Sequence, residues 1–320
     1  MLREEEVQQN PETEAEEECE EVEKEKEKRE TEIWKPDVLV LGPGGIKGFF
    51  ELGALCYLEE RGYLSDVNIF MGVSVGAIIS LMMVCGYKII EIIAESADAN
   101  IFDDLSSVSL KDTQRKLGLI SNAPIKRKLV NMVSKKFGYI PTLKQLYDTT
   151  GLELYCVTGN LDKETAEYMS YRTEPHLPVI DAVMYSMNIP IVFYKLKYKG
   201  CVYVDGALAN PYPVDILDDG TKRILGLYIE STSKTDSEPQ DSTTTMYIHK
   251  LIHFTMNQLR NRIIDSCSEN CKHIRLPTDI IDTTGLTVDA DVKADMIIKG
   301  YKIAQEFLKN LEVECNLEHI

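Results

Sequence analysis

The pentapeptide Gly72-Val73-Ser74-Val75-Gly76 constrains this chain more than any other feature, because of the segments on either side of it. The apolar residues 67–71 predict a short strand before it, and the apolar run 77–84 predicts a buried helix after it. A G-x-S-x-G sequence at such a junction is typical of a nucleophile elbow, in which Gly72 and Gly76 let strand and helix approach closely. The helix N-terminus also favours negative charge developing beside the serine. Alone the pattern is weak, but here it predicts Ser74 as a nucleophile for acyl transfer.

A second feature is the glycine-rich loop that follows the predicted strand 37–42 and runs into a predicted helix at Gly48. Such a loop presents backbone N–H groups to an anion. A nucleotide-binding loop is the weaker interpretation, because neither phosphate-binding glycine motif is complete and Lys47 is not followed by Ser or Thr. We therefore expect an oxyanion hole formed by the amides of Gly44, Gly45 and Ile46.

The third feature is Asp205, which ends the predicted strand 201–204 and enters a turn rich in Gly, Asn and Pro. An Asp-Gly pair in isolation is usually a turn former. The three strand-end loops together are more informative, because each carries a group that acyl transfer can use.

The three motifs, in this order, resemble those of the patatin-like phospholipases. The matching segments are Gly44-Gly45-Ile46-Lys47-Gly48, residues 72–76, and Asp205-Gly206-Ala207, and the likeness extends over roughly residues 35–230. The resemblance implies a three-layer α/β fold whose largely parallel central sheet has helices on both faces. It also implies a calcium-independent Ser74–Asp205 dyad acting on phospholipids or other acyl lipids at a membrane surface, with no cofactor and no metal.

Two positions depart from the family pattern. Pro43 stands where many members have another glycine, and because proline has no N–H, any oxyanion contact must come from Gly44 onward. In the segment 185–188, Tyr-Ser-Met-Asn, small residues are more common in the family. We expect this segment to alter packing near the site.

The dyad makes a specific demand on Asp205. An ordinary aspartate, with a pKa near ~3.9, is a weak base at neutral pH, so we expect burial to raise its pKa. Two alternatives remain open. One is a Ser-Asp-His hydrolase in which His249, His253 or His273 is the base. The other is a catalytically silent lipid-binding or scaffold protein on the same fold.

Charge divides the chain unevenly. Residues 1–32 hold 15 Glu against five Lys and Arg, a net charge of −10, whereas the whole chain carries −17. We interpret residues 1–34 as a disordered acidic tail and residues 35–315 as the catalytic domain. The remaining charge of about −7 argues against a nucleic-acid partner.

The setting also follows from the sequence. No secretory signal is evident, and the uncharged run 67–87 contains the elbow, so we interpret it as core rather than as a membrane span. The eight cysteines form no paired framework, and Cys267 with Cys271 is too little for a zinc site. An intracellular protein, cytoplasmic or peripheral on membranes, is the simplest interpretation.

The insert at about residues 96–147 is a candidate cap. Between residues 113 and 147 it has eight basic residues and no acidic one. A solvated helix face is the favoured interpretation. The alternative is a membrane contact through Lys126, Arg127 and Lys128, beside apolar residues of the same insert: Leu117, Leu119, Ile120, Leu129, Val130 and Met132. Further predicted elements are the helices 48–61, 75–86, 178–188, 245–266, 290–312 and one from residue 89, and the strands 152–158, 165–170 and 223–229, with a surface loop at 231–245.

Overall fold

The computed structural model describes residues 34–97, 118–231, 244–278 and 289–317. Within them, residues 35–311 form one compact unit. The strands are β1 (Val38–Leu41), β2 (Ile69–Val73), β3 (Gly118–Ile120), β4 (Glu153–Asn160), β5 (Thr165–Met169), β6 (Ile191–Phe193), β7 (Leu196–Tyr198), β8 (Cys201–Asp205), β9 (Ile224–Ser231) and β10 (Cys271–Thr278). The α-helices are α2 (Gly48–Glu60), α3 (Val75–Val84), α4 (Ile89–Ala97), α6 (Ala123–Phe137), α7 (Leu143–Thr150), α8 (Val179–Ser186), α9 (Thr244–Ser266) and α10 (Ala290–Leu317). Short 3-10 turns are η1 (Gly45–Lys47), η3 (Gly206–Leu208) and η4 (Pro213–Ile216).

The central sheet has the strand order β10-β9-β1-β2-β4-β8-β7, with β5 paired to β4. The neighbours from β10 to β4 are parallel, whereas β5, β8 and β7 pair antiparallel. Parallel strands need crossover connections, and the helices between them cover the sheet. The predicted largely parallel α/β fold is confirmed.

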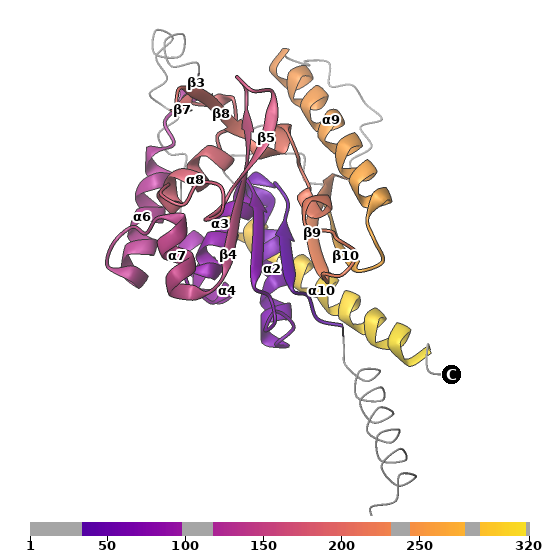
Figure 1. The fold of residues 1–320 in the computed structure, drawn as a ribbon. Coiled ribbons are helices and arrows are strands. Elements are labelled where there is room, and N and C mark those ends of the chain that lie inside the picture. The colour runs from indigo at the N-terminus through magenta and orange to yellow at the C-terminus, as the bar shows by residue number, and fades with distance from the viewer. Residues whose placement is uncertain (1–33, 98–117, 232–243, 279–288, 318–320) are drawn as a thin grey trace, which may run out of the picture. The chain divides into compact units, whose positions relative to one another are not determined.

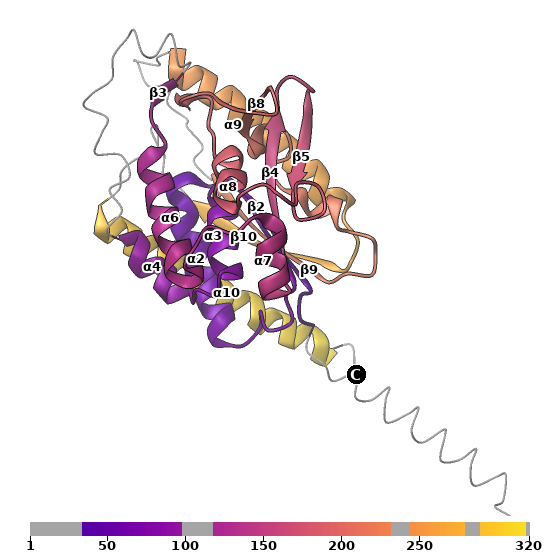
Figure 2. The same cartoon turned by 60° about the vertical axis from the view of Figure 1, so that its left-hand side comes forward.

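The sheet is packed on both faces. On one face, alternate strand residues such as Val38, Val40 and Met71 form a cluster with Ile263 of α9 and Val214 of η4. The opposite face packs against α2 and α3, and α10 lies against α2, where Gly53 and Gly300 leave no room for a side chain between the two helices. Three layers result, with α9 on one side and α2, α3 and α10 on the other (Figure 1 and Figure 2).

Most predicted elements are observed within a few residues of their predicted bounds. The strands β3, β6, β7 and β10 were not predicted. Cys271 begins strand β10. Strand β10 extends the sheet at its edge and pairs along its whole length with β9.

Several predictions concern residues outside the described ranges. Nearly all of the predicted acidic tail, most of the loop 231–245 and part of the insert lie there. The described part of the insert forms β3, α6 and the start of α7, and β3 pairs with β6. The assignment of the insert as a cap stays a prediction.

The membrane-contact hypothesis for the insert is wrong for three of its six apolar residues, whereas Val130 is half-buried and the side chains of Leu117 and Leu119 lie outside the described part. Ile120, Leu129 and Met132 are buried rather than presented to a bilayer. The basic half stays a prediction, but ion pairs weaken it: Lys126 pairs with Asp181, and Lys128 and Lys135 pair with Glu95. Separately, none of the described helices has the length and apolar content needed to cross a bilayer.

Candidate active site

The strand register brings Ser74 and Asp205 to the same level of the sheet. Val73, at the end of β2, lies opposite Val157 of β4, and the next residue of β4, Thr158, lies opposite Asp205 of β8. Ser74 and Asp205 therefore flank Thr158 from two sides, about two strand spacings apart. Side chains can bridge that separation, and the Ser74 side chain lies close enough to the Asp205 carboxylate to lower its pKa by a hydrogen-bonding interaction.

Ser74 has the backbone geometry of a nucleophile elbow. Its φ of 58° and ψ of −120° lie in a region that non-glycine residues seldom adopt, and such strain is concentrated at functional sites. The turn is possible only with glycine on both sides. A side chain on Gly72 would overlap the backbone of Gly76, and one on Gly76 would overlap the backbone of Leu41 in β1. Ser74 is almost completely buried.

Asp205 is buried, as expected from its predicted role. It is 4% exposed, and loss of solvent raises its pKa from 3.8 to about 6, against the opposing effects of hydrogen bonds from Ser74 and the Ala207 amide. The Ala207 N–H donates to Oδ1 at 2.9 Å. Among the described residues no cation opposes the desolvation, so Asp205 has the pKa of a base that works near neutral pH.

The end of α8 holds both residues in place. The Ser186 hydroxyl accepts a hydrogen bond from the Ser74 backbone N–H at 3.1 Å. Two residues later, the Asn188 carbonyl accepts from the Asp205 N–H at 2.8 Å, and its side-chain amide donates to the Tyr203 carbonyl at 2.9 Å. Ser186 and Asn188 are buried. The segment that departs from the family pattern thus contacts the backbone of both candidate catalytic residues.

The glycine-rich loop lies directly against the elbow. A side chain on Gly48 would come within 2.8 Å of the Val75 side chain, so the loop packs on the residue after Ser74. Gly45 has a φ of +55° and begins η1, in which Lys47 donates to the Gly44 carbonyl at 3.0 Å. The amides of Gly45 and Ile46 belong to the first turn, where the helix itself offers no acceptor. The loop can therefore direct N–H groups to a ligand, and its role as an oxyanion hole stays a prediction.

The histidines considered from the sequence occupy other positions. His273 lies in β10, three strands from β2, and its Nδ1 is 2.8 Å from the Tyr212 hydroxyl. His249 and His253 belong to α9. In the described part of the chain, the side-chain partner of Asp205 is Ser74 and its backbone partner is Ala207, and neither contact involves a histidine. This arrangement favours a dyad over a Ser-Asp-His triad.

A second buried carboxyl group lies close to the glycine loop. Glu51 of α2 is fully buried, and neither of its carboxyl oxygens has a hydrogen-bond partner. Burial raises its pKa well above the usual range, and the nearby Gly42 amide opposes this only in part. That amide also donates a hydrogen bond to the Leu227 carbonyl at 3.0 Å. Burial therefore favours the uncharged, protonated form of Glu51.

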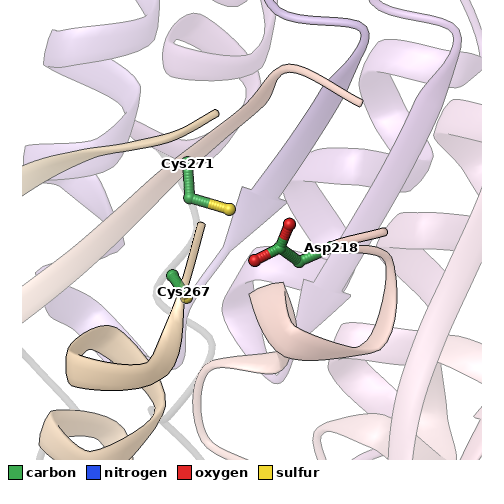
Figure 3. A group of neighbouring side chains, drawn as sticks. All are labelled: Asp218, Cys267 and Cys271. Atoms are coloured by element: carbon green, nitrogen blue, oxygen red, sulfur yellow. The ribbon is translucent and has the colours of Figure 1, made fainter. Parts of the chain in front are cut away.

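One cluster in the described residues combines possible metal ligands: Asp218, Cys267 and Cys271, whose ligand atoms lie within 4.8 Å of one another (Figure 3). The sequence analysis considered Cys267 and Cys271 as a pair and did not predict that Asp218 lies beside them. Asp218 accepts from the Ser268 N–H at 2.7 Å and the Ser268 hydroxyl at 2.6 Å. Burial, with the nearby Cys267 and Asp218, raises the pKa of the Cys271 thiol to about 12. The group is thus a hydrogen-bonded thiol cluster. It lies where β9 and β10 begin, at the opposite end of the sheet from Ser74.

Known proteins resemble this chain in sequence and in fold. A model of the family described as patatin-like phospholipase matches residues 39–218. "Probable lipid hydrolase 463L" of Invertebrate iridescent virus 6 is 30% identical over 184 residues, which cover 56% of this chain and 62% of that protein. An uncharacterized protein of Acanthamoeba polyphaga mimivirus is 27% identical over 202 residues, or 62% of this chain and 67% of that protein.

Among solved structures, VipD from Legionella pneumophila is similar in fold. The TM-score is 0.53 at 18% identity, and the match covers 87% of this chain and 67% of that chain. At this level of identity the likeness concerns the fold alone.

Proposed function

The chain belongs to the patatin-like phospholipase family, and we propose that it is a serine lipid acyl hydrolase of the phospholipase A or lysophospholipase type. The observation that carries the proposal is the buried contact between Ser74 and an aspartate whose pKa is raised to about 6. The name of the iridescent virus relative, a probable lipid hydrolase, supports the same class of reaction.

In the first half of the reaction, Asp205 accepts the proton of the Ser74 hydroxyl while Oγ attacks the acyl carbonyl carbon of the lipid ester. The carbonyl oxygen becomes an oxyanion, which the amides of Gly44, Gly45 and Ile46 stabilise by hydrogen bonds. Collapse of this intermediate breaks the ester bond, and the leaving alcohol takes the proton from Asp205. The acyl group is then bound to Ser74.

In the second half, Asp205 accepts a proton from water as the water oxygen attacks the acyl-enzyme carbonyl. The resulting intermediate collapses, the proton returns to Ser74 Oγ, and the fatty acid leaves. The Ser186 hydroxyl supports both halves of the reaction, because it accepts a hydrogen bond from the Ser74 N–H. This bond fixes the strained turn that orients the nucleophile.

A carboxylate can serve as the base because of its surroundings. At its ordinary pKa, an aspartate would be a poor acceptor for a serine proton at neutral pH. Burial brings the pKa of Asp205 to about 6, so the group is ionised at pH 7 and yet basic enough to take part in the transfer.

The proposal is tested by measuring fatty-acid release from mixed phospholipid vesicles in the presence of a chelator, for the wild type and for Ser74→Ala and Asp205→Asn. We expect release by the wild type and loss of release in both variants, with unchanged far-UV circular dichroism. Activity that persists in Asp205→Asn would point to a different base. Absence of release from every lipid and every soluble ester tested would instead support the silent lipid-binding protein.

A further inference from the structure

Helix α9 presents an unusual set of exposed side chains. Tyr247, Leu251 and Phe254 are 61%, 48% and 64% exposed. They are four and three residues apart, so they lie on one face of the helix as an apolar stripe. Farther along the same face the exposed residues are polar, for example Gln258 and Arg262. The stripe is thus confined to the first half of α9.

The inner side of α9 packs against the rest of the protein. Met256 and Leu259 pack against the core cluster that contains Ile263 and Ala207, and α9 contacts both η3 and η4. Because η3 begins directly after Asp205, α9 is anchored beside the candidate active site. The stripe therefore faces solvent on a helix whose other side is fixed.

Other exposed apolar residues lie in segments next to the site. Ile189 and Ile191, 37% and 53% exposed, follow Asn188, whose carbonyl binds the Asp205 amide. Leu208, 39% exposed, comes three residues after Asp205. Leu161, 55% exposed, is at the tip of the β4–β5 hairpin, at the end of the molecule where α9 also begins (Figure 1 and Figure 2).

The backbone at Ile191 is strained as well. Its φ is +73°, which is a genuine outlier for a β-branched residue. Strain of this kind persists only where the surroundings hold it, and it gathers at functional sites. Here it keeps an apolar side chain in solvent within a few residues of the segment that positions the dyad.

We propose that the stripe of α9 is the surface by which the protein docks on a phospholipid bilayer, and that Ile189, Ile191, Leu208 and Leu161 supply further apolar contacts near the candidate site. The proposal rests on the proposed function, since a lipid substrate must pass from the bilayer to Ser74. Apolar side chains of an interfacial helix enter the boundary between headgroups and acyl chains, and the exposed Lys250 beside the stripe favours anionic headgroups. In the described part of the insert, in contrast, Ile120, Leu129 and Met132 are buried.

The test uses the full chain carrying Ser74→Ala, so that vesicles are not degraded during the measurement. Leu251→Gln with Phe254→Gln replaces two apolar side chains by good helix formers. The matched control is Ile90→Gln with Ile298→Gln, which removes side chains that are 59% and 53% exposed on α4 and α10. Binding to phosphatidylcholine vesicles containing some phosphatidylserine is measured by sedimentation.

We expect the stripe variant to bind vesicles ~10- to 100-fold more weakly, because the transfer of two large side chains out of water is lost, and the control to bind as before. When the same substitutions are made in the protein that keeps Ser74, both variants should hydrolyse a soluble short-chain ester at the wild-type rate. Equal vesicle binding by the two variants would overturn the proposal. So would a dimer, seen by light scattering, that only the stripe variant dissociates, because the stripe would then bind a second copy.

Failure of the proposed function gives a different result. A protein without acyl hydrolase activity would leave even the soluble ester intact, whatever its affinity for vesicles. The binding measurement does not depend on catalysis, so the docking face and the reaction are tested separately.

Discussion

Replacing Asp205 with asparagine should abolish activity and at the same time stabilise the fold at neutral and alkaline pH. In the folded protein the pKa of Asp205 is raised from 3.8 to about 6 because the group is buried. Between those two values the unfolded chain has released the proton while the folded chain still holds it. Stability contributed by this group is therefore present below pH 4 and lost as the pH rises through about 6.

The size of the effect follows from the same shift. The difference between 3.8 and about 6 corresponds to about 3 kcal/mol of unfolding free energy. Asparagine keeps an oxygen for the Ala207 N–H but carries no charge to desolvate. We expect Asp205→Asn to be more stable than the wild type at pH 8 by up to about 3 kcal/mol, and to show a much smaller advantage at pH 4.

The assay is urea unfolding of both proteins between pH 4 and pH 8, followed by circular dichroism. Ser74→Ala is the matched control: it is also expected to be inactive, but it keeps the buried carboxylate and with it the pH dependence of stability. If the advantage of Asp205→Asn is the same at pH 4 and pH 8, or if the variant is less stable at pH 8, the reasoning about a desolvated Asp205 is refuted.

Three further predictions follow. The rate of soluble-ester hydrolysis by the wild type should rise with pH through about 6 and then level off, because Asp205 must be ionised to act; a flat profile between pH 5 and pH 8 would contradict this. Ser186→Ala should lower kcat by ~10-fold or more and the unfolding free energy by about 1–3 kcal/mol, because the buried Ser74 N–H loses its acceptor; Ser186→Thr, which keeps the hydroxyl, should recover part of the rate. Glu51→Met should raise the unfolding free energy by about 1–3 kcal/mol, because a carboxyl group buried without a partner is removed, and a lower thermal midpoint would indicate an overlooked partner.

The residues of the candidate site could be proposed from the sequence because their signals are local. Ser74, Asp205 and the loop glycines each stand within a short pattern that joins a strand to a turn or helix. The positioning role of Ser186 could not be read in this way. Its contact with Ser74 spans 112 residues, and a serine near the end of a helix has no distinctive pattern.

The misses in the fold have similar causes. Strand β10 lacks a regular alternation, because Lys272 and His273 both stand between Cys271 and Ile274. It also contains Pro277, a residue that usually marks a sheet edge, and β10 is the edge strand next to β9. In α6, Ile125, Leu129 and Met132 recur at helical spacing and are buried. That spacing indicates a face turned to the core, whereas the membrane-contact alternative assigned these apolar residues to a surface beside the basic ones.

The central claim is that Asp205 activates Ser74 as a nucleophile, and covalent labelling tests it most directly. The protein is incubated with an alkyl fluorophosphonate, which reacts with activated serines, and the adduct is located by peptide mass spectrometry. The account predicts one adduct, on Ser74, that is absent from Ser74→Ala and forms at least ~100-fold more slowly in Asp205→Asn. An adduct on another residue, or labelling of Asp205→Asn at the rate of the wild type, would contradict it.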